Sequence, residues 1–563
     1  MSGGTRGAAD PRRLLLAVCG AFALLSLALV PLGLPLGWDE LVYASRYAPH
    51  APATPFSAPR TRGVPLLIAP VAAWSDSVPL LRVWLTLLSS AGLYLGFRPW
   101  LRAAPRPSAA VVAAALYGGL WITLFYASAA MPNHYTAMGA VGAVGLFLCS
   151  RQSVRTYAGI AAGLALATLM RPNDGAAVGL PLLLAALLVP AWRRRGRVGA
   201  VLGGLAVGVL PWAVEAYVRF GGVRERLTEA SEVQGDLRPL LSFVHHLTAF
   251  DGPLLCRPCT GDGIRPVAAE WWLLLTVLVA TGLWATRRDS GTAARARPVG
   301  RPVGPARVTL LPRLTLLPRA SRLSRLTLLP RVSRLSRFGL LPRVSRLARL
   351  GLLPPATAAP RATAVPLGTA LALGTALAVA LPYLLLVPYA APRFLLPAHA
   401  LLAPVAALGL LTLVGWGRTV LPRWAVAGVA VLVLGGHLAV QMLLVQGHTT
   451  VQAAARGDWQ RIAAALQRHG VGNGPHPGAG TRAPCTLNGN TSVIPLAHTA
   501  GCAPGGGPRD PRRPTALVLR RAAPPPWARD WPRETVPGTY AAGWVIHVRP
   551  DRGEVVRQPT RTG

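Results

Sequence analysis

Long apolar runs separated by short polar segments dominate the chain. Because a helix needs about 17–25 apolar residues to cross the hydrocarbon core of a bilayer, each run is interpreted as a transmembrane helix. The runs lie near 14–36, 78–97, 108–126, 135–150, 156–171, 175–192, 198–217, 269–286, 366–390, 394–415 and 424–446. The pattern therefore predicts an all-α polytopic membrane protein with about eleven transmembrane helices.

The composition supports a membrane protein. Hydrophobic residues make up 52% of the 563 positions and charged residues only 14%, against about 25% charged residues in soluble domains. This excludes a coiled coil, a disordered chain and an ordinary cytosolic enzyme. The net charge of +38 would suggest nucleic-acid binding in a soluble protein. In a membrane protein the position of the arginines matters more, and we expect no nucleic-acid partner.

The arginines cluster on one side of the predicted spans. They flank the same alternate ends, at 6–13, 98–106, 151–155, 193–197, 287–288 and 418–423. The positive-inside rule makes this side cytoplasmic. The segments on the other side are 37–77, 127–134, 172–174, 218–268, 391–393 and the tail 447–563. We therefore expect a multi-pass plasma-membrane protein whose polar candidate residues and C-terminal tail are extracytoplasmic.

An arginine-rich loop divides the predicted spans into two groups. Residues 287–365 separate a module of eight spans, 1–286, from three further spans in 366–446. Within the loop, Leu-Leu-Pro recurs through 310–354, with arginines between the copies. One interpretation is a set of short amphipathic helices on the anionic inner leaflet. The other is a tandem expansion in a disordered loop that tolerates insertions. Neither predicts catalysis there.

The tail 447–563 is too polar and too rich in Pro and Gly to span a membrane. Residues 458–468 read as an amphipathic helix, and 517–519 and 544–548 read as strands. We predict a small α+β extracytoplasmic domain. Cys485 and Cys502 could then form a disulfide.

A second cysteine pair lies in the segment 218–268. Cys256 and Cys259 form one CxxC motif without a second pair of ligands, which argues against a zinc site. We therefore predict no metal site from the cysteines.

Two adjacent carboxylates, Asp39 and Glu40, follow the first span directly. Ionisable residues at a membrane boundary are costly, and they are often functional where they face a cavity. A carboxylate there can act as a general base or hold a divalent cation together with phosphate oxygens. The alternative is an ordinary solvated start of a loop. No cofactor follows from these residues, and a divalent cation stays open.

Four arginines on the same side are candidates for binding phosphate, because guanidinium groups grip phosphate oxygens in pairs. Arg60 and Arg62 lie in the first outward loop, where a solvated loop arginine is an equal alternative. Arg171 and Arg393 end or precede spans on the outer side, against the positive-inside trend. Two outer arginines opposite an acidic pair indicate an anionic, lipid-linked substrate.

Other outward polar residues are candidates for acceptor binding or support. They are Tyr43 after the acidic pair, Asn133 and His134 in the second outward loop, and Asp174 in the third. His134 could be an acid–base group or a ligand, although a lone histidine in a loop is often neither.

Four of these motifs together resemble a known family. They are the acidic pair after the first span, Arg-Gly-x-Pro at 62–65, Arg-Pro at 171–172 and Arg-Phe-Leu-Leu-Pro at 393–397. The chain resembles the GT-C glycosyltransferases, and among them the bacterial dolichyl-phosphate-mannose-protein mannosyltransferase and lipid A aminoarabinose transferase group. The resemblance covers about 1–446 without the arginine-rich loop.

The resemblance implies a fold and an activity. Such enzymes move a sugar from a polyprenyl-phosphate carrier to an acceptor hydroxyl on the outer face, with inversion at the anomeric carbon. It implies that Asp39 is the base, that Glu40 supports it or contacts a substrate, and that the arginines, Arg171 and Arg393 first, hold the carrier phosphate. The expected partners are this donor, the bilayer, and a lipid, protein or cell-envelope polysaccharide acceptor.

Two features separate this chain from many relatives. Its second outward loop has no acidic residue, and the chain contains no lysine. Two other functions stay open, namely a transporter or flippase for a lipid-linked or anionic solute and a catalytically inactive membrane scaffold. Transporters favour internal repeats and polar residues at the middle of the membrane. Here no two-half repeat is evident, and the ionisable residues lie at the outer boundary, which favours the enzyme.

Overall fold

The computed structural model describes residues 10–257, 259, 266–295, 361–472, 485–505 and 514–550. The arginine-rich repeat at 310–354 lies outside the described residues. Both interpretations of that loop therefore stay predictions.

Each of the eleven predicted apolar runs contains a helix. They are α1 (Pro11–Leu29), α4 (Val78–Phe97), α6 (Pro107–Gly118), α8 (Asn133–Leu148), α9 (Val154–Met170), α10 (Pro172–Leu188), α11 (Arg195–Phe220), α14 (Pro266–Arg295), α16 (Arg361–Leu385), α17 (Leu396–Val420) and α18 (Arg423–Arg468). Among the described residues, seven helices are long and apolar enough to cross a membrane. The other four, α6, α8, α9 and α10, have 12 to 17 residues.

Small residues let the helices of the bundle approach closely. A Cβ atom added to Gly139 of α8 would lie 2.5 Å from the carbonyl oxygen of Gly163 of α9, and one on Gly409 of α17 would lie 1.9 Å from that of Leu278 of α14. Close backbone contact at small residues is typical of helix packing in membranes, where lipid removes the hydrophobic drive between helices. As a result α8 is almost wholly buried inside the bundle, although it is short.

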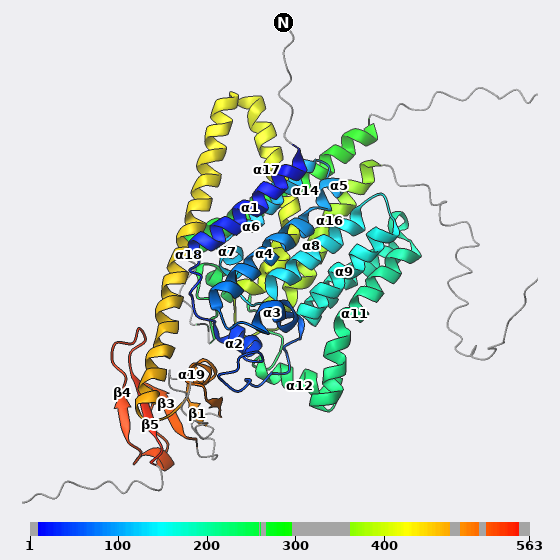
Figure 1. Ribbon diagram of the computed structural model, residues 1–563. Coiled ribbons are helices and arrows are strands. Elements are labelled where there is room, and N and C mark those ends of the chain that lie inside the picture. The colour runs from blue at the N-terminus through cyan, green and yellow to red at the C-terminus, as the bar shows by residue number, and fades with distance from the viewer. Residues whose placement is uncertain are drawn as a thin grey trace, which may run out of the picture.

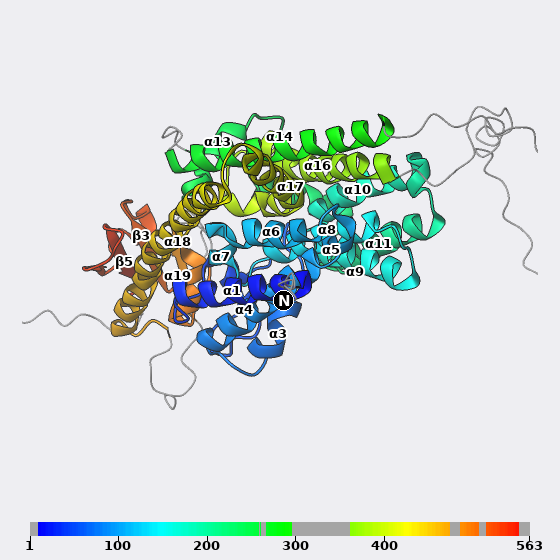
Figure 2. The same cartoon turned by 90° about the horizontal axis from the view of Figure 1, so that it is seen from above.

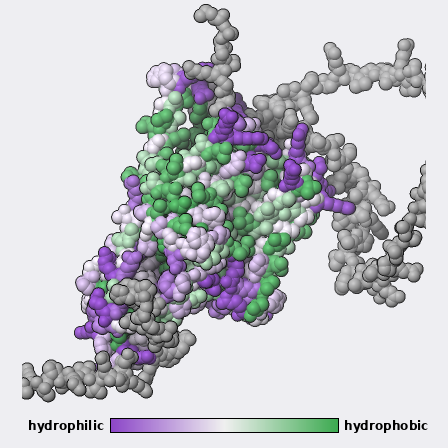
Figure 3. Space-filling view, in the orientation of Figure 1, coloured by the Kyte–Doolittle hydropathy of each residue, from purple (hydrophilic) through white to green (hydrophobic). Residues whose placement is uncertain are grey.

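The outer helices turn large apolar side chains away from the protein. Leu210 on α11 is 59% exposed, and Val431 and Leu432 on α18 are 73% and 76% exposed. In Figure 3, hydrophobic residues gather on the middle of the visible face and hydrophilic residues toward its ends. A soluble protein rarely exposes such an apolar surface, so these side chains are expected to face lipid.

Two predicted elements differ from the structure. The third run, 108–126, is broken after α6, and a short helix α7 (Trp121–Tyr126) follows. The Trp121 N–H there donates to the side-chain oxygen of Gln441, 2.9 Å away on α18. The predicted last span and the tail helix 458–468 are one continuous helix, α18, of 46 residues. It runs from the turn after α17 along the bundle to the C-terminal sheet (Figures 1 and 2).

The C-terminal domain is a five-stranded sheet with the order β2-β1-β3-β5-β4. Its strands are β1 (Thr486–Gly489), β2 (Ala503–Pro504), β3 (Ala516–Arg520), β4 (Arg533–Thr535) and β5 (Trp544–Val548). β1 is parallel to β2 and β3, whereas β5 is antiparallel to β3 and β4. Alternate residues of β3 and β5, such as Val518 and Ile546, pack with Ile462 and Leu466 of α18. The two predicted strands are thus confirmed, and α18 forms part of the domain core.

One end of the bundle gathers several of the short helices that do not span it. These are α2 (Trp38–Ala44), α3 (Gly63–Ala72), α12 (Val223–Val233), α13 (Phe243–Thr248) and, within the sheet domain, α19 (Val493–Ala500). Figure 1 places α2, α3, α12 and the C-terminal domain at the end opposite the start of α1 and the turn between α17 and α18. We call this the domain end of the bundle.

Candidate active site

The acidic pair lies on the short helix α2 at the domain end. Gly37 precedes this helix, and its N–H donates to Oε2 of Glu40 at 2.7 Å. This hydrogen bond from the N-cap backbone to the third residue of the helix fixes the first turn and so the direction of both carboxylates. A side chain at position 37 would collide with Arg456, because a Cβ atom there would lie 2.8 Å from a guanidinium nitrogen. Glycine at the entrance to the helix therefore leaves room for the guanidinium of Arg456.

Glu40 is buried and fully engaged. Its carboxylate accepts from Arg82 at 2.6 Å and from the Ala130 N–H at 2.9 Å, and Arg456 lies 3.4 Å away. Burial alone would raise the pKa of Glu40, but the charges of Arg82 and Arg456 hold that pKa below its usual range. Glu40 thus ties α2 to α4 and α18, and only 4% of it is exposed.

Asp39 points to the other side of α2 and stays partly open. Its two carboxylate oxygens lie 2.7 Å from a nitrogen of Arg60 and 3.2 Å from one of Arg393, and 33% of its side chain is exposed. Burial would raise the pKa of Asp39, but the charges of Arg60 and then Arg393 lower it below its usual range. The carboxylate is therefore ionised at neutral pH, with both oxygens facing guanidinium groups. A divalent cation at Asp39 would have to displace one of them.

A cavity of about 190 Å³ opens in front of Asp39. Its walls come from α2, α7, α18 and the two outward segments that carry Leu254 and Arg393. Tyr126 of α7 and Trp459 of α18 supply aromatic surface. Segments far apart in the sequence thus meet around one carboxylate.

The two outer arginines flank a single aromatic ring. The guanidinium carbons of Arg171 and Arg393 lie 5.1 and 5.3 Å from the ring centre of Phe394. Arg171 pairs with Asp174 at 3.2 Å, and Tyr383 donates to the same carboxylate. Stacking on aromatic rings holds a guanidinium while leaving several of its N–H groups free for other acceptors. The structure therefore brings Asp39, Arg60, Arg171, Arg393 and Asp174 into one neighbourhood.

Arg62 lies outside this neighbourhood, although it is two residues from Arg60. It pairs with Glu215 on α11, and the buried Arg226 pairs with the same carboxylate at 3.1 Å. Arg226 also donates to the backbone carbonyls of Ala58 and Arg60. This cluster anchors the loop that carries Arg60 and explains why the two arginines diverge.

The remaining sequence candidates, Tyr43, Asn133 and His134, do not line the cavity in front of Asp39. His134 lies inside the bundle, with its ring nitrogens 3.2 Å from the hydroxyl of Tyr117 and 3.0 Å from the carbonyl of Ser89. Asn133 is buried at the start of α8, and its amide has no hydrogen-bond partner among the described residues. Tyr43 is buried on α2, and its ring centre lies 5.2 Å from the guanidinium carbon of Arg60.

Four cysteines form two disulfides at the domain end. Cys485 pairs with Cys502 in the C-terminal domain, as the sequence suggested. Cys256 also pairs with Cys259, which the sequence reading did not predict. The Cys256 N–H donates to the carbonyl of Ala390 at 2.9 Å, and Arg393 donates to the carbonyl of Leu254 at 2.8 Å. This loop therefore orients Arg393.

The described residues contain no group of three or more His, Cys, Asp or Glu that could hold a metal.

Two arginines of the site were missed in the sequence. Arg82 lies within an apolar helix, α4, and Arg456 lies 416 positions from Glu40 on α18. A charged residue inside an otherwise apolar span is a signal by itself, because it needs a buried partner. Arg82 could have been found by this signal. Arg456 could not, because the residues around it in the sequence are polar and a further charge there is ordinary.

Comparison with solved structures decides the fold. No protein-family model matches the chain, and no curated protein matches it in sequence. The structure of ArnT from Cupriavidus metallidurans bound to undecaprenyl phosphate aligns with a TM-score of 0.53 at 12% identity, over 96% of this chain and 99% of that one. ArnT in the apo state aligns with a TM-score of 0.52 at 14% identity over the same shares.

The chain has the GT-C fold. The alignment runs over almost the whole of both chains, so it includes the membrane helices and the C-terminal domain. The fold class predicted from the motifs is therefore confirmed. At this level of identity the likeness concerns the fold, and the chemistry has to be argued from the residues around Asp39.

Proposed function

We propose that this protein is a membrane glycosyltransferase that moves a sugar from a polyprenyl-phosphate carrier to an acceptor hydroxyl. One observation carries the proposal. An ionised carboxylate, Asp39, lies in a cavity at one end of a membrane bundle, and arginines from two distant segments converge on it. A base beside several guanidiniums fits a reaction whose donor and leaving group carry a phosphate.

Asp39 acts as the general base in this proposal. The acceptor hydroxyl gives its proton to the carboxylate while its oxygen forms a bond to the anomeric carbon. The bond from that carbon to the phosphate oxygen breaks, and its electron pair leaves with the carrier phosphate. Attack opposite the leaving group inverts the anomeric configuration. Glu40 is a positioning residue, since its carboxylate is buried against Arg82 and Arg456.

The arginines bind the donor and stabilise the leaving phosphate. Arg60, Arg171 and Arg393 face the carboxylates Asp39 and Asp174, which leaves one net positive charge beside the cavity. The donor is a phosphodiester with one negative charge, and the carrier phosphate that leaves is a monoester with up to two. Fixed cations aimed at the charge that develops lower the barrier without protonating the leaving group. When the donor phosphate binds Arg393, the ion pair between Arg393 and Asp39 is broken. Asp39 then has one arginine partner instead of two, so it is a stronger base.

The domain end is extracytoplasmic in this proposal. The described segments 98–106 and 418–423, which carry arginines of the predicted cytoplasmic side, lie at the opposite end, where α1 starts and α17 turns into α18 (Figure 1). Both disulfides lie on the domain side, and disulfides persist in oxidising compartments. ArnT, which shares the fold, was solved with undecaprenyl phosphate. These observations support a plasma-membrane enzyme that uses a lipid-linked donor at its outer face, with a lipid, protein or polysaccharide acceptor.

The test is sugar transfer in oriented membrane vesicles with labelled polyprenyl-phosphate sugars. Wild type should release the sugar from its carrier at the outer face, and Asp39→Asn should lose this turnover by at least about a hundredfold, the low end for a general base. The matched control Asp530→Asn changes an exposed carboxylate of the C-terminal domain and should keep full activity.

Other results would change the proposed function or the role of Asp39. Movement of the intact lipid-linked sugar across the membrane, without cleavage, would establish a transporter instead. Full turnover by Asp39→Asn would remove Asp39 as the base. Absence of both cleavage and transport across the donor panel would refute the glycosyltransferase and favour a scaffold.

A further inference from the structure

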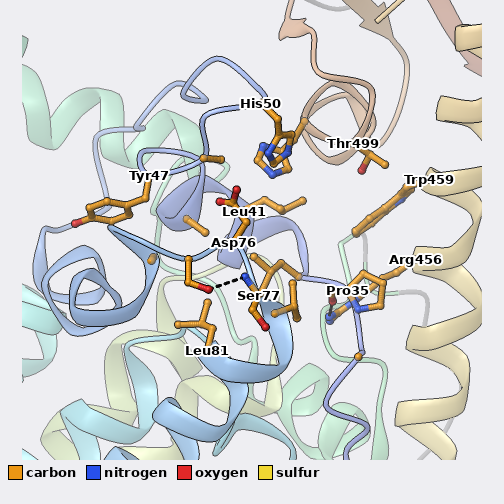
Figure 4. A pocket seen from close by; sticks show the side chains of 18 of the residues that line it. Pro35, Leu41, Tyr47, His50, Asp76, Ser77, Leu81, Arg456, Trp459 and Thr499 are labelled. Carbon is orange, nitrogen blue, oxygen red and sulfur yellow. Dashed lines mark hydrogen bonds between the residues drawn. The ribbon is translucent and has the colours of Figure 1, made fainter. Parts of the chain in front are cut away.

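A second, larger cavity adjoins the Asp39 cavity. It has a volume of about 310 Å³ and lies between the first outward loop, the start of α4, and the helices α18 and α19 (Figure 4). Arg456 and Trp459 line both cavities. Helix α2 forms the wall between them, with Asp39 on one side and Leu41 on the other. The two cavities thus share a border at Arg456 and Trp459.

The lining of this cavity combines an aromatic surface with a few dispersed polar groups. Trp459 contributes the aromatic surface, and Asp76, His498 and Thr499 contribute oxygen or nitrogen atoms. In Figure 4 the labelled Asp76, Thr499 and Trp459 surround the same opening from three different elements. His498 is 8% exposed, and its Nδ1 has no hydrogen-bond partner among the described residues.

The charges of the lining argue against an anionic ligand. Arg456 is the one guanidinium among the lining residues, and it is already held by Glu40 and by the carbonyl of Pro35. Asp76 adds a negative charge on an exposed segment. A phosphate or carboxylate would thus meet no unpaired arginine and one like charge. A neutral ligand with several hydroxyl groups meets donors and acceptors instead.

The volume of the cavity and its aromatic wall narrow the class of ligand further. About 310 Å³ lies at the lower end of the range for small-ligand pockets, which suits a compact ring better than a folded segment of protein. A sugar ring presents an apolar C–H face, which fits against Trp459, and a rim of hydroxyls, which fits the dispersed polar groups.

We propose that this cavity is the acceptor subsite and that it takes a neutral sugar ring of a glycan or glycolipid. The inference rests on the proposed function, because it assigns the hydroxyl that Asp39 deprotonates. It also gives the C-terminal domain a role, because Thr499 and His498 of α19 close one side of the subsite. The acceptor is then held between the membrane module and the domain.

The experiment uses the full-length protein in nanodiscs with a labelled polyprenyl-phosphate sugar. The acceptor probes are octyl mannoside, octyl galactoside and octyl arabinoside, with a serine- and threonine-containing peptide for comparison. Thr499→Trp fills the cavity, and Thr535→Trp places the same side chain on the exposed strand β4. Asp76→Asn is a milder second variant, with Asp530→Asn as its control.

We expect the octyl glycosides to accept the sugar and the peptide not to accept it. Thr499→Trp should raise the KM for the glycoside at least tenfold, Asp76→Asn should raise it severalfold, and both controls should leave it unchanged. The KM for the donor should move by less than twofold in every variant, which also shows that the variants are folded.

Two results would overturn the subsite. One is an unchanged acceptor KM in both Thr499→Trp and Asp76→Asn, and the other is transfer to the peptide but to none of the glycosides. Hydrolysis of the donor by water is measured in wild type without any acceptor. Donor hydrolysis with a failed subsite leaves the glycosyltransferase intact, whereas the absence of both hydrolysis and transfer refutes the glycosyltransferase itself.

Discussion

Removing Arg60 should change the pH at which Asp39 works as a base. Arg60 is the nearer of its two ion-pair partners, at 2.7 Å against 3.2 Å for Arg393. It is also the strongest influence that lowers the pKa of Asp39 against the opposing effect of burial. In Arg60→Gln burial persists while the main lowering charge is gone. The pKa of Asp39 must therefore rise.

The size of the rise follows from the geometry. An adjacent opposite charge lowers the pKa of a carboxyl by about 1–3 units. A third of the Asp39 side chain is exposed, so solvent screens the pair, and Arg393 remains in place. We therefore expect the lower end, a rise of about 1 pH unit. Because the base must be ionised, activity is lost as the pH falls through this pKa, so the acid limb of the profile moves to higher pH.

The assay is the pH profile of kcat/KM for the donor, which reports the ionisation of the free enzyme. Wild type, Arg60→Gln and the matched control Arg62→Gln are compared in the same nanodiscs. Arg62 lies two residues away but pairs with Glu215, so its loss should leave the acid limb in place. Arg60→Gln also weakens donor binding, which lowers the whole profile without moving its limb.

Two outcomes would contradict this reasoning. An acid limb at the wild-type position in Arg60→Gln would mean that Asp39 is not the titrating base or that the ion pair is absent in the working enzyme. An equal shift in Arg62→Gln would mean that the effect is a general change of net charge. The position of the limb decides the question, and the absolute rate does not.

Further predictions concern the supports of the site. Glu40→Ala leaves the buried Arg82 without its carboxylate and should cost about 3–5 kcal/mol of stability, measured as a loss of thermal stability in detergent that Asp39→Asn does not show. Cys256→Ser frees the loop whose backbone holds Arg393 and should raise the donor KM severalfold; an unchanged donor KM would separate that disulfide from the site. Asp458→Ala removes the acceptor for the N–H groups of residues 540 and 541 and should loosen the C-terminal domain by about 1–3 kcal/mol, seen as faster proteolysis after residue 468.

Much of the fold follows from the sequence because its causes are local. The bilayer imposes the length and apolarity of a spanning helix, so all eleven apolar runs contain helices. Two strands of the tail were visible as short runs of mostly apolar residues, 517–519 and 544–548. The break after α6 and the continuity of α18 were not visible. The N–H group exposed at that break is satisfied by Gln441 from a helix more than 300 positions away.

The sequence by itself determined where the chemistry could be, and the tertiary structure decided which side chains share it. An acidic pair at the exit of the first span and outer arginines on two later segments were evident in the chain. Their roles diverged only in the folded protein, where Glu40 is locked by Arg82 and Arg456 while Asp39 faces a cavity. The physical reason is that local sequence sets the type and direction of an element, whereas an ion pair depends on which distant helix comes to lie beside it.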